Sequence, residues 1–325
     1  MTTPVIAGKA ILKRHPVQRG VAGADDAGRR LDNYLLARVD VPRQVVYRWI
    51  RTGQVRVNRG RAKPSYRLRA DDEVRIPPHS PEGPARPDSP LPDIPIPILY
   101  EDDELLVVDK LAGLAVHGGS RIRFGLIDVL RQHRGEDEFL ELAHRLDRGS
   151  SGCLVIARSR SALLNIQSQF RKRAVQKTYW VLVAGQWPEH VREVRQSIRI
   201  NRHHARHRKA MVDEAGKETY TRFRPLEQFE QSCLVEACIE TGRTHQIRVH
   251  AAEAGHPVIG DDRYGDRPVN GWARKQGFKR LFLHARSLGF AHPANESKTT
   301  VQAPLDAACR KLLASLRDET ADPSL

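Results

Sequence analysis

The sequence predicts an α+β protein of two domains, and three observations predict it. A chain of 325 residues has the length of two domains, or of one domain with a smaller partner. Apolar residues recur at helical spacing in some segments, and in others they alternate or run together as they do in strands. Nine prolines stand within residues 77–97, where neither a helix nor an interior strand can form. With 40% hydrophobic residues, the chain can build a core.

The proline-rich segment sets the expected domain boundaries. Residues 1–26 are expected to form a basic, flexible tail, and residues 27–76 a small α/β domain. The linker covers residues 77–97, and a larger domain follows over residues 98–305. Residues 306–325 are expected to form a terminal helix and a short tail.

The small domain contains two predicted helices and a predicted hairpin. Leu31–Val39 and Val45–Ile50 have helical spacing, and Gln54–Asn58 and Ala70–Ile76 alternate as strands do. Seven cations cluster on and after the second helix: Arg43, Arg48, Arg51, Arg56, Arg59, Arg61 and Lys63. A solvated basic face is one explanation, but so many cations on so few elements favour a site for RNA phosphate.

The larger domain is expected to be rich in strands. The predicted strands are residues 98–100, 105–108, 153–157, 175–183, 219–223, 232–237 and 281–285. The predicted helices are residues 127–133, 161–170 and 306–317. Within the segment 241–250, Ile247 and Val249 alternate with Arg248 and His250.

A charged turn precedes the predicted strand at 153–157. It places Asp147 between Arg145 and Arg148, with glycines close behind. Nearby positive charge favours an ionised carboxylate, so Asp147 is a candidate nucleophile or base. A turn aspartate that caps the next element is the structural alternative.

Four motifs in this chain resemble those of the pseudouridine synthases of the RluA/RsuA superfamily. The first to note is His144-Arg145-Leu146-Asp147 followed by Ser151-Gly152, in which the family has its catalytic aspartate. Gly149 stands where most members carry an acidic residue. The resemblance covers about residues 27–304, and the order of the motifs is also that of the family. It implies an isomerase that converts uridine in RNA to pseudouridine, on a scaffold with a mixed, mostly antiparallel sheet.

The other motifs supply the remaining residues of the implied site. Asp109–Gly119 resembles the first family motif, with Leu111 where proline is common. Lys177-Thr178-Tyr179 resembles the motif whose tyrosine lies in the active site. In Thr241–His250 the arginine that pairs with the catalytic aspartate would be Arg248. The implied substrate-binding residues are His144, Arg145, Lys177, Arg243, His245, Gln246 and Leu283, the last as an apolar wall for the base.

The small domain resembles the S4 RNA-binding module. The similarity lies in Arg30-Leu31-Asp32, Val55–Asn58 and Lys63-Pro64-Ser65. It implies that the cations that contact RNA are Arg43, Arg48, Arg51, Arg56 and Lys63. Further similarity at Val116–Ser120, Gly185–Trp187 and Asp261–Arg267 is to members that act on large-subunit ribosomal RNA.

Composition agrees with an RNA substrate. The net charge is +15, from 54 lysines and arginines against 39 acidic residues, which points to nucleic acid or an anionic membrane. No apolar run approaches membrane-spanning length, so a cytoplasmic protein is expected. The expected partner is 23S ribosomal RNA or a large-subunit assembly intermediate, bound by a monomer.

No metal or cofactor is expected. The four cysteines have no zinc-like spacing, and Cys233 and Cys238 are expected to be reduced core residues. His203, His204 and His207 lie among arginines without a cysteine or carboxylate to complete a metal shell, so a basic loop that contacts RNA is preferred.

The chemistry of the implied reaction fits one carboxylate. Asp147 would attack either C1′ of the ribose or C6 of the base, and the sequence leaves both open. A glycoside hydrolase would need a second carboxylate in a comparable motif, and none is found. The base must leave its stack to reach Asp147. Two alternatives remain: a pseudouridine synthase acting on transfer RNA, and a non-catalytic S4-type ribosome-assembly protein.

Overall fold

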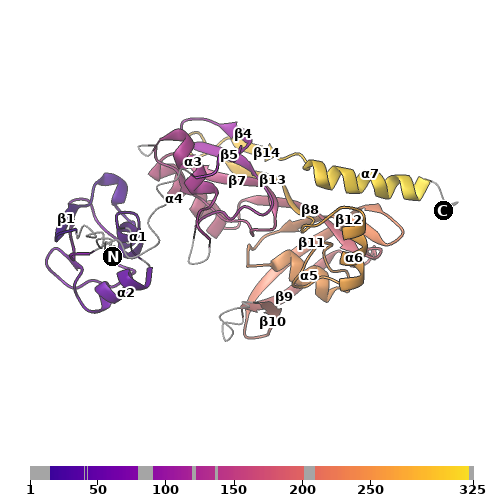
Figure 1. Ribbon diagram of the computed structural model, residues 1–325, viewed down its shortest axis with the longest axis horizontal. Helices are drawn as coiled ribbons and strands as arrows, with labels where there is room; N and C mark the ends of the chain where they lie inside the picture. The colour runs from indigo at the N-terminus through magenta and orange to yellow at the C-terminus, as the bar shows by residue number, and fades with distance from the viewer. Residues whose placement is uncertain are drawn as a thin grey trace, which may run out of the picture. The chain divides into compact units, whose positions relative to one another are not determined.

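The computed structural model describes residues 15–39, 41, 43–79, 91–118, 122–135, 138–200 and 209–321, and Figure 1 shows their helices and strands. The chain divides into two units, Met1–Pro90 and Leu91–Leu325. This division falls within the proline-rich segment, whose last residues, from Leu91 on, belong to the second unit. The Leu91 amide donates to the side chain of Gln132, and Pro97 accepts from the amide of Asp109.

The first unit is a three-stranded antiparallel sheet with two helices. Its elements are β1 (Gln18–Val21), the 3-10 helix η1 (Ala24–Asp26), α1 (Leu31–Leu36), α2 (Arg43–Arg51), β2 (Arg56–Val57) and β3 (Glu73–Ile76). The strand order is β1-β3-β2. Leu31, Tyr34, Val46 and Val74 lie in its buried core, so the predicted helical faces are the faces that pack.

The prediction that residues 1–26 form a flexible tail is wrong for its second half. Gln18–Val21 pairs with β3 along its whole length, from Gln18 opposite Ile76 to Val21 opposite Glu73. A short edge strand that pairs on one side, with Val17 and Val21 exposed, has no strong apolar alternation to predict it.

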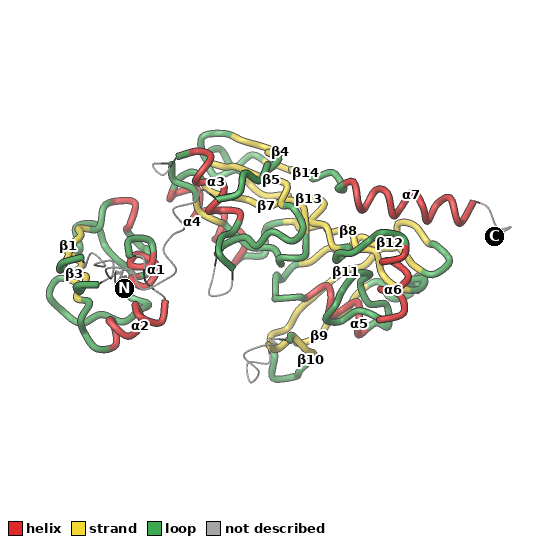
Figure 2. The backbone as a smooth tube through the Cα atoms, viewed as in Figure 1, coloured by secondary structure: helices red, strands yellow, loops and turns green. Residues whose placement is uncertain are grey.

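The second unit is built on one large sheet (Figure 2). Its strands are β4 (Ile98–Glu101), β5 (Leu105–Lys110), β6 (Glu141–Leu142), β7 (Ser151–Ala157), β8 (Gln176–Ala184), β9 (Glu193–Ile200), β10 (Ala210–Val212), β11 (Lys217–Gln228), β12 (Ser232–Ile239), β13 (Leu283–Ala291) and β14 (Lys298–Gln302). The order is β10-β9-β11-β12-β8-β13-β7-β5-β4, with β14 on β13 and β6 on β7. Among these described pairs, only β7 and β13 run parallel, so the predicted mixed, mostly antiparallel sheet is confirmed.

Helices cover both faces of this sheet. They are α3 (Leu126–Arg134), α4 (Arg160–Arg171), α5 (Gln246–Glu253), α6 (Arg267–Lys275) and α7 (Ala307–Ala321). α3 and α5 pack on one face, together with the inward residues of β5, β7, β8, β12 and β13. α4 packs on the opposite face at one end, and α6 and α7 pack on β8 and β12 at the other. The predicted helices at 127–133, 161–170 and 306–317 are confirmed within a few residues.

A close approach of two strands fixes one glycine beside the signature turn. Gly152 in β7 lies opposite Ala285 in β13 and has a φ of +106°. A Cβ atom at this position would lie 2.3 Å from the carbonyl oxygen of Ala285. Only glycine fits both this backbone conformation and this spacing.

Two segments differ from the sequence analysis. Ile247 and Val249 alternate with Arg248 and His250 in the sequence, but the segment is helix α5 and all four residues are buried. The expected basic loop over 198–209 lies partly in strands, since β9 extends to Ile200 and β10 begins at Ala210. His203, His204 and His207 lie outside the described residues.

Candidate active site

Asp147 lies in the turn between β6 and β7, and its backbone closes that turn. The amide of Ser150 donates to the carbonyl of Asp147 at 3.1 Å, so the turn forms with Gly149 between them. A Cβ atom at Gly149 would meet Leu281 at 3.5 Å, which is ordinary contact. The absence of the family's acidic residue therefore leaves the turn intact. The Asp147 side chain is 19% exposed, so its carboxylate is both sheltered and reachable.

Lys110 holds the turn from behind, and the sequence analysis did not select it. Its side chain is fully buried at the end of β5. Its Nζ donates to the carbonyls of Leu111, Leu114 and Arg148 at 2.9, 2.8 and 3.3 Å. Burial lowers the pKa of Lys110 to about 7, against the opposing effect of Asp147. Lys110 therefore ties the first motif to the turn that carries Asp147.

Arg248 of α5 faces Asp147, as the resemblance implied. Its Nη1 lies 3.4 Å from Asp147 Oδ2. Its Nε and Nη2 donate to the two carboxylate oxygens of Asp261 at 2.6 and 2.7 Å. Burial lowers the pKa of Arg248, but the hydrogen bonds and charge of Asp261 outweigh burial and raise it. The guanidinium is thus charged and held in one orientation.

Asp261 is fixed in turn by its own backbone. One of its carboxylate oxygens accepts from the amides of Arg263 and Tyr264 at 2.8 and 3.1 Å. Burial raises the pKa of Asp261, and the Arg248 guanidinium and these amides more than offset it, so the pKa lies below its usual value. The buried, ionised Asp261 carboxylate therefore holds the Arg248 guanidinium in place.

His245 is a second group that faces the carboxylate. It precedes α5 in the left-handed conformation, with a φ of 59°. Its Nε2 lies 3.8 Å from Asp147 Oδ2, and its Nδ1 lies 2.8 Å from the hydroxyl of Tyr264. Burial lowers the pKa of His245 to about 4, against the opposing charge of Asp147. His245 is therefore neutral near pH 7.

Tyr179 and Leu283 lie in the same apolar cluster, on neighbouring strands. Lys177 and Tyr179 share one face of β8, as their spacing predicted. Burial, with the charge of Asp147 as the next cause, raises the pKa of Tyr179 well above its usual value. The phenol therefore keeps its proton, and its ring belongs to the same buried apolar cluster as Leu283.

A basic groove of about 510 Å³ lies beside Tyr179. Its cationic lining residues are Arg145, Arg171, Arg173, Lys177 and Arg243. Glu240 is the acidic residue of the lining, and its backbone carbonyl accepts from Lys177 Nζ at 2.8 Å. The groove can accept an anionic chain next to Tyr179.

Two predicted substrate-binding residues are occupied inside the protein. His144 Nε2 accepts from the amide of Val155 at 3.0 Å, and its ring stacks on Phe170. The Gln246 side chain is buried. It forms hydrogen bonds with the hydroxyls of Thr241 and Thr221 and with two backbone groups. Burial also lowers the pKa of His144 to about 3, so its ring is neutral. Gln246 therefore supports the site from within, whereas His144 is half-buried and lines the groove, and Arg145 and Arg243 are exposed.

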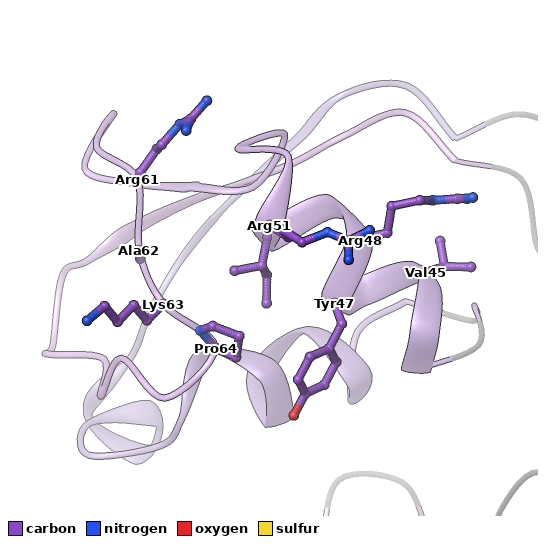
Figure 3. A pocket seen from close by; sticks show the side chains of 9 residues that line it. Val45, Tyr47, Arg48, Arg51, Arg61, Ala62, Lys63 and Pro64 are labelled. Carbon is purple, nitrogen blue, oxygen red and sulfur yellow. The ribbon is translucent and has the colours of Figure 1, made fainter.

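The first unit has its own basic hollow, between α2 and the segment at 61–64 (Figure 3). Its volume is about 970 Å³. Arg48 and Arg51 of α2 and Arg61 and Lys63 of the segment line it. Arg56 is not among its lining residues, and the side chain of Arg43 lies outside the described residues. Three of the five predicted RNA-binding cations thus lie together, with Arg61 added.

Metal ligands do not cluster in the part of the chain that the structure describes, which holds no group of three His, Cys, Asp or Glu side chains able to bind an ion. Each of the four cysteines is a free thiol, but Cys238 is only half-buried, so its predicted core position is wrong. No helix among the described residues has the length and apolar character needed to cross a membrane.

The sequence analysis missed Lys110, Asp261 and Tyr264 as parts of the site. Asp261 and Tyr264 stand in a segment that resembled the family, but nothing local reveals that their partners are Arg248 in α5 and His245 just before it. The signal for Lys110 was its place in the first motif, where a lysine ends a strand that is buried at every position but Asp109.

Comparisons with known proteins identify the families to which both parts of the chain are similar. Residues 104–253 match the family described as RNA pseudouridylate synthase, and residues 29–74 match the S4 domain. The chain is 45% identical over 303 residues to "Ribosomal large subunit pseudouridine synthase C" of Pasteurella multocida, covering 91% of this chain and 92% of that one. For the protein of the same name from Yersinia pestis, identity is 46% over 310 residues, covering 93% and 96%.

Two solved structures with a similar fold also carry pseudouridylate synthase in their names. "Human RNA Pseudouridylate Synthase Domain Containing 4" has a TM-score of 0.56 and 28% identity, covering 68% of this chain and 93% of that one. "Human RNA Pseudouridylate Synthase Domain Containing 1" has a TM-score of 0.54 and 27% identity, covering 70% and 97%.

Proposed function

The chain belongs to the family of RNA pseudouridine synthases, and we propose that it isomerises uridines in 23S ribosomal RNA of the large subunit. Support for this substrate comes from relatives about 45% identical over about 90% of the chain, whose names specify the large ribosomal subunit. The net charge of +15 and the S4 domain also fit a structured RNA. The same proposal assigns the enzyme to the cytoplasm, acting as a monomer on free rRNA or an assembly intermediate.

The proposed nucleophile is Asp147, and the contact with Arg248 carries the proposal. The fixed guanidinium donates to Asp147 Oδ2 at 3.4 Å, and so orients the carboxylate for attack. The reaction breaks the bond between N1 and C1′ and joins C5 to C1′, while C5 loses its proton and N1 gains one. A single carboxylate suffices as the nucleophile, and attack at C1′ or at C6 is compatible with this geometry.

The proposed base pocket uses Tyr179 and Leu283. The target uridine must leave its stack to reach a carboxylate that is only 19% exposed. Since the pKa of Tyr179 is raised, we assign its ring to stacking against the flipped base. Leu283 would pack against the same base from β13. Arg145, exposed at the groove, is the side chain proposed to fill the gap left in the RNA.

The proposed path of the RNA strand is the basic groove. Arg171, Arg173 and Arg243 would contact phosphates on either side of the target nucleotide. In the first unit, Arg48, Arg51, Arg61 and Lys63 would hold a separate part of the RNA. These contacts position the substrate and supply most of the salt-dependent affinity.

Replacing Asp147 with Asn tests the proposal directly. Asn has nearly the same shape, so the variant should fold and bind RNA, but it lacks the anionic nucleophile. Tritium release from 5-tritiated uridine in 23S rRNA should fall to background. Asp262→Asn is a matched control, because Asp262 pairs with Arg274 and is 82% exposed. Release at the parent rate by Asp147→Asn would contradict the proposed role.

The alternatives give different results in the same assay. A non-catalytic RNA-binding protein would release no tritium in either form. A synthase for transfer RNA would release tritium from transfer RNA and not from rRNA, with the same dependence on Asp147.

A further inference from the structure

We infer that Tyr264 is a positioning residue that holds His245 with its N–H facing the catalytic carboxylate. This inference rests on the proposed function, because it assigns a role to side chains around Asp147. It replaces the sequence-based expectation that His245 contacts the substrate RNA. The argument depends on which ring nitrogen of His245 carries the proton.

The hydroxyl of Tyr264 determines that proton's position. It accepts a hydrogen bond from the amide of Ala210, in β10, at 2.8 Å. Its own proton then needs an acceptor, and His245 Nδ1 lies 2.8 Å away. His245 Nδ1 is the acceptor to which we assign this proton. The proton of the neutral ring therefore lies on Nε2.

The protonated nitrogen faces Asp147. His245 Nε2 lies 3.8 Å from Asp147 Oδ2, the same oxygen that Arg248 Nη1 approaches at 3.4 Å. A distance of 3.8 Å is longer than a hydrogen bond, and catalytic contacts in free enzymes often tighten when substrate binds. Two donors thus converge on one oxygen and leave the other oxygen of the carboxylate for the uridine.

One short segment controls both donors. Asp261 orients Arg248. Tyr264, three residues after Asp261 in the chain, orients His245. The ring of Tyr264 also lies beneath the Arg248 guanidinium, whose Cζ is 5.1 Å from the ring centroid. His245 has a left-handed backbone, with a φ of 59°, a conformation that places its side chain against Tyr264 at a small cost in stability.

Burial supports the neutral state that the inference needs. The groups whose charges act on His245 are Asp147, Arg248, Arg263 and Asp261. Burial lowers the pKa of His245 to about 4, so the ring donates one hydrogen bond and adds no charge near pH 7.

Two substitutions of His245 separate the possible roles. In His245→Asn the amide reaches the place of Nδ1 but not that of Nε2, and Asn tolerates the left-handed backbone. In His245→Gln the amide reaches the place of Nε2. We expect His245→Asn to lower kcat roughly 10-fold or more, with the dissociation constant for rRNA unchanged, and His245→Gln to recover part of the loss. An unchanged kcat in His245→Asn, or a weaker affinity at the same kcat, would overturn the inference.

A second measurement does not depend on activity. Imidazole ¹⁵N chemical shifts of the full chain should show His245 protonated on Nε2, and Tyr264→Phe should convert it to a mixture of tautomers. Tyr220→Phe is the matched control, because it removes a hydroxyl that contacts the exposed Glu193. A parent protein protonated on Nδ1 would refute the inference even with full activity. If the parent releases no tritium while the tautomer is as expected, the proposed function fails and the assigned tautomer stands.

Discussion

Arg248 uses three nitrogens on two carboxylates, and this division explains why arginine is needed there. Two nitrogens bind the fixed Asp261 in a planar fork, and the third is aimed at Asp147. A lysine ammonium is a single point with no such fork, so it can satisfy one carboxylate at the expense of the other.

Replacing Arg248 with Lys should therefore lower the rate at saturating RNA by roughly 100-fold, with a much smaller change in RNA affinity. Single-turnover tritium release gives the rate, and filter binding gives the affinity. Arg274→Lys is the matched control, because Arg274 also pairs with an aspartate but is 55% exposed. An Arg248→Lys enzyme as fast as the parent would make Arg248 only a buried structural cation.

At this scale the sequence predicted the proposed catalytic residues better than the residues that support them. Asp147, Tyr179 and Arg248 stand in motifs, and the structure brings Arg248 to Asp147. Asp261 is invisible as a partner of Arg248 because only folding brings the two together. His144 has a motif position too, but its nitrogen is taken by a backbone amide that the sequence does not reveal.

Two acidic side chains, Asp109 and Asp306, lie near each other in elements behind the turn that carries Asp147. Asp109 lies near the end of β5 and close to Asp306, the residue just before α7. The Asp306 carboxylate accepts a hydrogen bond from Arg280. Burial, with Asp306 as the next cause, raises the pKa of Asp109 to about 6. The folded state therefore retains the proton of Asp109 to a higher pH than the unfolded chain does.

Replacing Asp109 with Asn should stabilise the protein at neutral pH. Below about pH 4 the carboxyl is protonated in both states of the parent, and the variant gains nothing. Between pH 4 and 6 the unfolded chain ionises first, so the parent loses stability and the variant's advantage grows to roughly 1–3 kcal/mol above pH 6. Urea unfolding from pH 4 to pH 8 measures this. A constant difference at every pH would show that Asp109 has no raised pKa.

Element prediction worked where one face of an element is buried and the other is not. α4 is of this kind, with Ala162, Leu163 and Ile166 inside and its polar side exposed. α5 is buried from Gln246 to Ala251 on every side, so its sequence carries no helical period and alternation misleads. β9 contains polar and apolar residues without strict alternation, and the sequence analysis did not predict it.

In the whole molecule, the proposed catalysis belongs to the second unit and a separate RNA contact to the first. Removing the first unit tests this division. The second unit contains Asp147 together with Arg248 and His245, which face it, so a chain lacking residues 1–90 should keep its turnover on a short, saturating RNA. Its affinity for rRNA should weaken, and the slope of log affinity against log salt should become shallower by roughly 3, for four lost phosphate contacts.

The replacement of Arg48, Arg51, Arg61 and Lys63 by Gln in the full chain is the matched comparison, because it removes the charges but keeps the unit. Both proteins should show the same change in slope. Loss of saturating turnover in a folded deletion would mean that the first unit takes part in the chemistry.

The contact between β7 and β13 also bears on how the gene can change. Any side chain at position 152 meets the Ala285 carbonyl in a backbone conformation that only glycine adopts easily. In a glycine codon the third base is silent, whereas a change in the first or second base introduces a Cβ atom or a stop. Neutral substitutions at this codon are therefore confined to its third base. The residues around Gly152 can change in evolution, but the codon for position 152 must remain a glycine codon.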